Sequence, residues 1–438
     1  MTSVEFGALM FGVCLLLIAL RMPVAIAMFV TGGFGFASLA GWSAFLNLLN
    51  TVPFGRVSSY TLSVLPLFLL MGQFATRAGL GRRLFDSARA WTGHYRGGLA
   101  MSTIVGSAAF GSVCGSSIAT GATMASVALP EMKRHNYSGG LATGALAAGG
   151  TLGILIPPSV ILVIYAVITE QSIGKLFLAA VVPGLIATIG YTIAIAVYVR
   201  FKPGAGPVVE ALPIRERIRS LGMVWPVALI FMSVVGGIYF GLFTPTEGAA
   251  IGAAATGLVA LASGRLSWAA FASCLLETAK TTAMIFLILI SAQILNSFLA
   301  LSQVTTELAD VLTGSGLSPV LILVGILLAY LVLGCVMDSL AMILLTVPVF
   351  FPLLIGLDFG YTEEQTAVWF GVLALFTVEI GLITPPIGLN VYVINSLDRE
   401  TPLGESFRGV VPCLLSGLVV LALILSIPAL CLWLPGLL

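Results

Sequence analysis

Two pairs of adjacent prolines interrupt apolar segments of this chain, one in each half. They are Pro157-Pro158 and Pro385-Pro386, and they lie 228 positions apart in a sequence of 438 residues. Proline has no N–H and clashes with the preceding turn, so a helix that enters either pair must unwind. In a bilayer, unwound backbone is tolerated only where protein buries it or where it lines a watery cavity. Matched interruptions in two halves are typical of the binding sites of secondary transporters.

Composition places the chain in a membrane. Hydrophobic residues make up 59% of it and charged residues only 8%, whereas soluble domains carry about 25% charged residues. The net charge is +1 and there is no basic tail, so no nucleic-acid partner is expected. The first apolar run follows no basic segment, and we interpret it as a retained span rather than a cleaved signal. The six cysteines show no CxxC pair, so neither a disulfide framework nor a tightly bound cofactor is expected.

The apolar segments predict an all-α polytopic membrane protein. A span needs about 20 apolar residues. We expect ten full transmembrane helices, two of them broken at the prolines, at about 4–20, 23–40, 60–76, 140–168, 178–199, 223–243, 246–262, 281–300, 364–396 and 409–434.

Two further apolar stretches are too long for one crossing. Residues 99–130 carry no charge, and residues 317–352 carry only Asp338. A single helix of either length would measure about 50 Å, against a hydrocarbon core of about 30 Å. Each stretch has a break of small or polar residues at its middle, at 111–117 and at 334–339. We therefore expect two re-entrant helical hairpins.

The distribution of basic residues predicts which ends of the spans face the cytoplasm. If the first hairpin enters from the cytoplasm, all Lys and Arg residues except Arg56 and Lys175 fall on the cytoplasmic side, as the positive-inside rule requires. Both termini are then periplasmic, and the second hairpin enters from the opposite face. The short amphipathic segments at 80–96 and 266–278 are expected to lie in the membrane interface, as a brace for a moving part or as static lipid-facing helices.

The two halves are repeats. Residues 21–27 correspond to 243–249, and an amphipathic segment that begins at Leu80 recurs at 301–314. The hairpins and the proline pairs follow at similar offsets. Each half has an odd number of crossings, so the second half is inverted. We expect a first repeat at 1–220 and a second at 221–438.

The broken helices and hairpin tips predict two cation sites. Carbonyls freed before a proline pair suit a hard cation such as sodium, and a hairpin-tip serine adds a hydroxyl oxygen. The first set of candidate ligands is Ser116, Gly153, Ile156 and Pro158. The symmetry-related set is Gly334, Asp338, Gly381, Thr384 and Ile387. For the serines, and for Asp338, the alternative is simple N-capping of the returning helix.

An organic anion is expected beside these cations, because free N–H groups and the positive end of a half-helix dipole attract negative charge. The candidate substrate-binding residues are Ser117, Ser159, Ser339, Pro386 and Asn390. Glu379 is the second acid predicted deep in the membrane. It is a functional candidate because burying it is costly, with backbone N–H groups around Gly381 as its expected partners. Capping is the preferred interpretation for Glu247, and helix–helix contact for Gln293.

The chain contains no phosphate-binding GxxxxGK[ST] loop, GxSxG elbow or HExxH motif. We therefore expect that the protein is not an enzyme. We expect transport that either draws on an ion gradient or is passive.

Several motifs together resemble the large membrane (M) subunit of the tripartite ATP-independent periplasmic (TRAP) transporters. The matching runs, in order, are 110–117, 129–132, 150–159, 243–248, 336–339 and 379–390. The resemblance implies a sodium-driven, elevator-type importer of organic acids such as C4-dicarboxylates or sugar acids, in a bacterial inner membrane. It also implies a periplasmic solute-binding protein and a small four-helix membrane (Q) subunit as separate partners.

Two other functions remain open from the residues. A related ion-coupled carboxylate transporter would work alone, without a binding protein. A passive channel would conduct without accumulating its substrate. The cargo, the number of sodium ions per cycle and the choice between sodium and proton coupling are not readable from these motifs.

Overall fold

The computed structural model describes residues 2–314 and 316–437, and helices form almost all of the regular structure in that part of the chain. The first half contains α1 (Ser3–Ala19), α2 (Val24–Ala40), α3 (Trp42–Val57), η1 (Tyr60–Ser63), α4 (Val64–Arg77), α5 (Leu80–Thr92), α6 (Gly98–Cys114), α7 (Ser117–Arg134), α8 (Gly139–Leu155), α9 (Val160–Thr169), α10 (Ile173–Phe201), η2 (Pro203–Ala205) and α11 (Ile214–Leu221).

The remaining elements lie in the second half of the chain. It contains α12 (Trp225–Phe231), η3 (Met232–Gly236), α13 (Gly237–Tyr239), α14 (Pro245–Ala262), α15 (Trp268–Ser302), α16 (Val304–Gly314), α17 (Pro319–Gly334), α18 (Ser339–Ile355), α19 (Glu363–Gly381), α20 (Leu389–Leu397), α21 (Leu403–Ser426), α22 (Ala429–Leu432) and η4 (Pro435–Leu437).

Both predicted hairpins and both predicted helix breaks form. The stretch 99–130 becomes α6 and α7, and 317–352 becomes α17 and α18. The first proline pair separates α8 from α9, which bend by 42°. The second separates α19 from α20. Both Pro-Pro peptide bonds are cis. The chain is an all-helical polytopic membrane protein.

Length and apolar composition single out the spans. In the described residues, α10, the run 214–239, α15 and α21 are long and apolar enough to cross a bilayer. Two bent segments are also long and apolar enough to cross. One is α3 followed by η1 and α4, with a bend of 53°, and the other is α8 followed by α9. The shorter apolar helices, such as α1 and α2 with 17 residues each, measure about 25 Å.

The expectation of an interfacial helix at 266–278 is wrong. Residues 268–302 form one continuous helix, α15, because no glycine or proline interrupts this run. The other amphipathic segment does form a short helix, α5. It buries Leu84 and Phe85 and packs against both limbs of the first hairpin and against α11.

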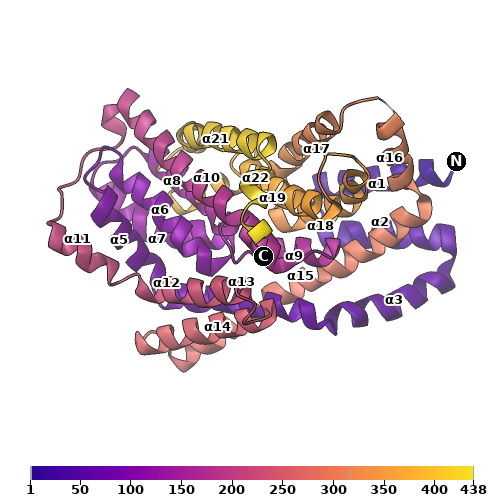
Figure 1. The fold of residues 1–438 in the computed structure, drawn as a ribbon, viewed down its shortest axis with the longest axis horizontal. Coiled ribbons are helices and arrows are strands. Elements are labelled where there is room, and N and C mark those ends of the chain that lie inside the picture. Colours follow the sequence, from indigo (N-terminus) through magenta and orange to yellow (C-terminus); the bar gives the residue numbers. More distant parts are fainter. Residues whose placement is uncertain (1, 315, 438) are drawn as a thin grey trace.

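Figure 1 shows helices along each long side of the molecule and further helices, among them α6, α9 and α18, between them. Along one long side lie α3, α14 and α15, and along the other lie α8, α17 and α21. Helix α15 packs against α2, α3 and α4, whereas α8 packs against α6, α7 and α21. Almost every residue of α8 is buried, and its sequence is largely Gly, Ala and Thr. Small residues of this kind let membrane helices approach closely. Close approach increases the van der Waals contact that stabilises helix association in lipid.

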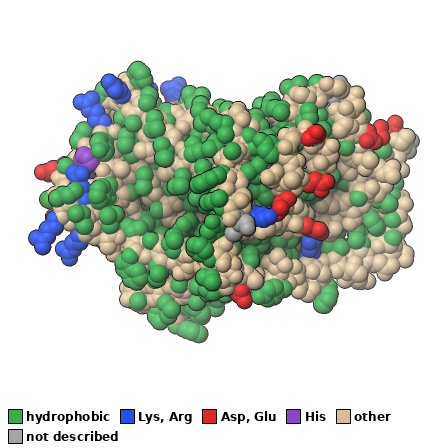
Figure 2. Space-filling model, viewed as in Figure 1, with side chains coloured by type: hydrophobic (Ala, Val, Ile, Leu, Met, Phe, Trp, Pro, Cys, Tyr) green, Lys and Arg blue, Asp and Glu red, His purple; other side chains and the backbone are tan. Residues whose placement is uncertain are grey.

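Charge separates along the long axis of the molecule. On the face in Figure 2, most Lys and Arg side chains gather at the end that α5 and α11 occupy, and most Asp and Glu side chains lie toward the other end.

Candidate functional site

The first hairpin turns at Gly115, which has a φ of 65°. This left-handed conformation favours glycine. A Cβ added at Gly115 would also lie 2.9 Å from the carbonyl oxygen of Pro158. The turn therefore presses directly against the broken helix of its own repeat, with no side chain between the two backbones.

The first helix break follows from its prolines. Pro157 and Pro158 have no N–H to donate to the carbonyls of Gly153 and Ile154, four residues earlier. Beyond the break, the Ser159 hydroxyl caps α9 by accepting from the N–H of Leu162, at 3.4 Å. A Cβ added at Gly111 of the hairpin would lie 2.5 Å from the Gly153 Cα. Two polar features, freed carbonyls and a helix N-terminus, thus sit beside the hairpin tip.

The second repeat builds the same contact. A Cβ added at Gly381 would lie 2.7 Å from the Gly334 Cα. The N–H of Gly388, in the break, donates to the carbonyl of Cys335 at the hairpin tip, at 3.3 Å. The Thr384 hydroxyl does not reach the tip, because it donates to the Ile380 carbonyl in its own helix, at 2.7 Å.

Both hairpin tips, together with the helix ends that flank both breaks, line one cavity of about 150 Å³. It lies between these elements and the helices α4 and α15. Of the predicted site residues it brings together Ser116 and Ser117 from the first tip with Asp338 and Ser339 from the second. The rest of the lining is apolar apart from Gly115 and Thr281: Leu69, Ile118, Ile154, Val160, Ile161, Met284, Ile285, Leu340, Leu382 and Leu389.

Other predicted site residues lie outside this cavity. Gly153, Ile156 and Pro158 are buried around the first break, and Ser159 is buried at the N-terminus of α9. Asn390 is also buried, at the start of α20, and neither polar atom of its side chain has a hydrogen-bond partner among the described residues. Pro386 and Ile387 line a second, larger cavity next to Asp338.

Capping is visible at both tips. Ser116 accepts from the N–H of Ala119 at 3.4 Å. Asp338 accepts with Oδ1 from the N–H groups of Leu340 and Ala341, at 3.1 and 3.0 Å. These bonds fix the tips. Only Oδ1 of Asp338 takes part in the hydrogen bonds found among the described residues.

Glu379 is fully buried in α19, and its partner is a side chain that sequence reasoning did not identify. Its Oε1 accepts from the Ser339 hydroxyl at 2.6 Å. Among the described residues, Oε2 has no hydrogen-bond partner. The expected bonds to backbone N–H groups around Gly381 are absent from the described hydrogen bonds, because Glu379 lies within the intact last turns of α19. The Ser339 contact spans 40 residues, and no local pattern could have revealed it.

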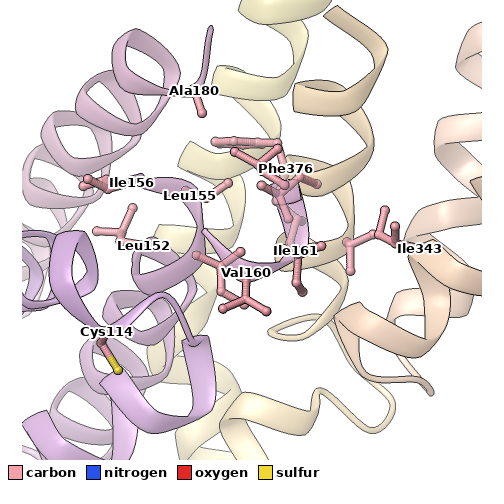
Figure 3. Packing of buried hydrophobic residues seen from close by; sticks show 14 of the residues in the cluster. Cys114, Leu152, Leu155, Ile156, Val160, Ile161, Ala180, Ile343 and Phe376 are labelled. Carbon is pink, nitrogen blue, oxygen red and sulfur yellow. The ribbon is translucent and has the colours of Figure 1, made fainter. Parts of the chain in front are cut away.

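Helices of the two halves of the chain pack against each other around the site. Helix α9 packs against α18 and α19 of the second repeat, and α20 packs against α7 and α8 of the first. Figure 3 shows the apolar side of the first junction, where Ile161 of α9 points toward Ile343 of α18, with Phe376 of α19 close by. All three side chains are buried.

A polar network joins the repeats at the far ends of α7 and α20. Lys133 lies 2.7 Å from Asp398, whose side chain is fully buried, and 2.9 Å from Glu400. Thr401 donates to Asp398 at 2.6 Å. Burial raises the pKa of Asp398, but the bonds from Lys133 and Thr401 outweigh it and hold the pKa below its ordinary value of 3.8. Hydrogen bonds to Asp398 and Glu400 raise the pKa of Lys133 above 10.5.

Two further polar residues have structural roles, as predicted. Glu247 forms a capping box with Thr244 at the start of α14. Gln293 of α15 accepts a hydrogen bond from Arg56 of α3 and so joins two helices.

Two hairpins that face two broken helices, inside an all-helical membrane chain, define a transport protein of the secondary-transporter class. The chain belongs to the family of the tripartite ATP-independent periplasmic transporter, DctM component, whose model matches residues 11–430. It is therefore a permease component rather than an enzyme.

Curated relatives cover most of the chain. It is 38% identical to the C4-dicarboxylate TRAP transporter large permease protein DctM of Pseudomonas aeruginosa, over 86% of each chain. It is 33% identical to the sialic acid TRAP transporter large permease protein SiaM of Vibrio cholerae, over 92% of this chain and 94% of that one. It is 30% identical to the isethionate TRAP transporter permease protein DctMQ of Oleidesulfovibrio alaskensis, over 98% of this chain and 66% of that longer one.

A solved structure shares the fold. The Alcanivorax borkumensis YdaH transporter, described as having an unusual topology, aligns with a TM-score of 0.63 over 90% of each chain, at 15% identity.

Proposed function

We propose that this chain is the membrane-embedded transport subunit of a sodium-driven, binding-protein-dependent importer of organic acids. The observation that carries the proposal is the cavity lined by both hairpin tips and by the helix ends that flank both breaks. Helix termini and interrupted backbone at the centre of an inverted repeat are the usual means by which secondary transporters hold an anion beside coupling cations.

Sodium ions are the proposed coupling ions. In the first repeat the oxygen donors are the carbonyls before Pro157 and the hairpin-tip residue Ser116. In the second they come from the tip residues Gly334 and Asp338 and from the break at 381–387. Carbonyl, hydroxyl and carboxylate oxygens are the ligands that hard cations prefer. The direct backbone contact of each tip with its break supports the idea that one ion bridges the two.

The organic anion is proposed to bind between the two tips. Ser117 and Ser339 line the shared cavity, and the N-termini of α9 and α20 supply positive dipole ends. Ser159, Pro386 and Asn390 are proposed to support the anion from the breaks. C4-dicarboxylates are the first substrate class to test, because the relative at 38% identity carries that name. Sialic acid, named for the relative at 33% identity, is the second.

An elevator-type cycle is proposed for two groups of helices. The group of α6–α9 and α17–α20 would carry the site across the bilayer past the group of α2, α3 and α15. The extensive packing within each group supports motion as two bodies. The proposed location is a bacterial inner membrane, with both termini in the periplasm.

A periplasmic solute-binding protein and a small four-helix membrane subunit are the proposed partners. The family description names a tripartite transporter, and the isethionate relative named DctMQ is longer than this chain.

The test is uptake into proteoliposomes that contain this chain and its cognate small subunit. Labelled succinate and sialic acid are offered with and without the binding protein, under an imposed sodium gradient at constant pH. We expect accumulation only with both the binding protein and the gradient. Uptake without the binding protein would identify a stand-alone transporter. Equilibration without accumulation would identify a channel, and uptake that follows only a proton gradient would reject sodium coupling.

A further inference from the structure

A second cavity, of about 880 Å³, adjoins the candidate substrate site. The two cavities share three lining residues, Met284, Asp338 and Leu389. The larger cavity is bounded on one side by the junction of α1 and α2 and by α15, and on the other by the second hairpin tip and the second break. It therefore lies between α1, α2 and α15 on one side and the second hairpin on the other. This is next to the place where the anion is proposed to bind.

Arg21 is the one basic side chain among the described residues that line this cavity. It is exposed, and none of the ion pairs or side-chain hydrogen bonds among the described residues involves it. The other charged residue in the lining is Asp338, whose Oδ1 already accepts two backbone N–H groups. Arg21 thus lines the cavity as a cation that has no ion-pair partner among the described residues.

The backbone at Arg21 gives a second, independent observation. Its φ is 70°, in the left-handed region where a side chain is disfavoured and glycine is usual. Arg21 occupies the position where α1 ends, and its N–H donates to the Ile18 carbonyl at 2.9 Å. A glycine would close this helix end with less strain. An arginine held in a disfavoured conformation at the mouth of a cavity is the kind of outlier that points to a function for its side chain.

We propose that the larger cavity is a release vestibule, and that Arg21 binds a carboxylate group of the organic acid as it leaves the site between the hairpin tips. This inference rests on the proposed function for the substrate class. Guanidinium groups suit this task because their planar donors match the two oxygens of a carboxylate. In the orientation that the positive-inside rule favours, Arg21 lies at the cytoplasmic end of α1, so the vestibule opens toward the cytoplasm.

Site-directed labelling tests the proposal without any transport step. The six native cysteines are buried, and Ile26, which lines the larger cavity, is 47% exposed. The Ile26→Cys protein, in sodium-containing detergent solution, is treated with a fluorescent maleimide with and without succinate. We expect succinate to slow labelling by about tenfold at saturation, and Arg21→Gln to raise the succinate concentration for half-protection by about tenfold, the loss expected for one charge-assisted hydrogen bond.

Two variants serve as controls. Arg21→Lys keeps the charge, so it should retain part of the protection. Arg408→Gln removes an exposed charge outside the cavity, and should leave protection unchanged. Equal protection in Ile26→Cys and in its Arg21→Gln derivative would overturn the proposal, as would the absence of protection by both succinate and sialic acid.

A lipid headgroup is the other source of an anionic oxygen at Arg21. The labelling is repeated in nanodiscs of zwitterionic and of anionic lipid. If anionic lipid slows labelling and the acids do not, the vestibule holds lipid and the proposal fails. Wild-type uptake, measured separately, reports on the proposed function. Normal sodium-driven uptake with no effect of Arg21→Gln on protection would reject the vestibule while leaving the transporter intact.

Discussion

Ser339 at the tip of the second hairpin donates its hydroxyl to Glu379, a fully buried carboxylate in the broken helix of the same repeat, at 2.6 Å. This bond ties the tip of the second hairpin to α19 through side chains, beside the backbone contact of Gly334 with Gly381. It also gives Glu379 a place in the site, because Ser339 lines the cavity between the two tips.

Removing the Ser339 hydroxyl should weaken the fold. Ser339→Ala leaves the buried carboxyl group of Glu379 without its described hydrogen bond, so we expect the free energy of unfolding to fall by about 1–3 kcal/mol, the usual penalty for leaving a buried polar group without its partner. Thermal unfolding of the purified protein measures the loss. Ser339→Thr keeps a hydroxyl and should restore most of the stability. A Ser339→Ala protein as stable as the wild type would show that the bond contributes nothing.

The glycine contact in the second repeat should not tolerate a methyl group. Gly381→Ala would place its Cβ 2.7 Å from the Gly334 Cα, and such overpacking costs about 1–3 kcal/mol. Because the tip must shift, we expect uptake to fall together with the melting temperature. Gly325→Ala is the matched control, since a Cβ at Gly325 in α17 meets nothing within 4 Å. Equal uptake by the two variants would argue against close contact at the tip.

Asp338 allows capping to be separated from cation binding. Asparagine retains a capping oxygen but not the charge, so Asp338→Asn should keep the melting temperature. If the carboxylate also faces the cation, the half-saturating sodium concentration for uptake should rise about tenfold, which corresponds to about 1.4 kcal/mol. Asp338→Ala should lose stability as well, by about 1 kcal/mol. If the half-saturating sodium concentration of Asp338→Asn equals that of the wild type, cation binding by Asp338 is rejected and N-capping is its only remaining role.

The Lys133–Asp398 pair should show a defined pH dependence. Lys133→Ala removes the cation beside a buried carboxylate. We expect a loss of about 2 kcal/mol, less than the roughly 3–5 kcal/mol for a fully buried pair, because the Lys133 side chain is 39% exposed. Lys280→Ala is the control, since that pair is exposed on both sides and should contribute less than about 1 kcal/mol.

The sign of the effect follows from the two pKa shifts. Asp398 has a folded-state pKa below its ordinary 3.8 and Lys133 one above its ordinary 10.5. The pair therefore stabilises fully between these values, loses its contribution as pH falls through the folded pKa of Asp398, and loses it again as pH rises through that of Lys133. Denaturation at several pH values should show a constant difference between wild type and Lys133→Ala near neutrality, shrinking below about pH 4. A difference that grows on acidification would contradict the assignment.

Much of the fold could be predicted because its constraints are local. Proline pairs must break helices, and apolar stretches of 32 and 36 residues with at most one charge are too long for one crossing, so the breaks and the hairpins could be predicted from the sequence. The helix α3 was missed because Asn47, Asn50 and Pro53 lower its apolar character. The beginning of α15 was misplaced because its amphipathic start continues into a span without a breaking residue.

The contacts within the site were less predictable, for a physical reason. The partner of Glu379 is 40 residues away, and the walls of the larger cavity come from helices at both ends of the chain. Nothing in the local pattern around Arg21 distinguishes it from an ordinary residue that orients a span. Only its backbone conformation and its place in the cavity set it apart.

Helices α9 and α20 each pack against helices of the other half of the chain, and this has a consequence for how the protein is made. Helix α9 emerges early in synthesis, yet α18 and α19, against which it packs, follow nearly two hundred residues later. Until α18 and α19 are made, the apolar side of α9 lacks the neighbours that bury it in the finished protein. Because residues of both halves line the candidate site, it can form only after the second half has been synthesised.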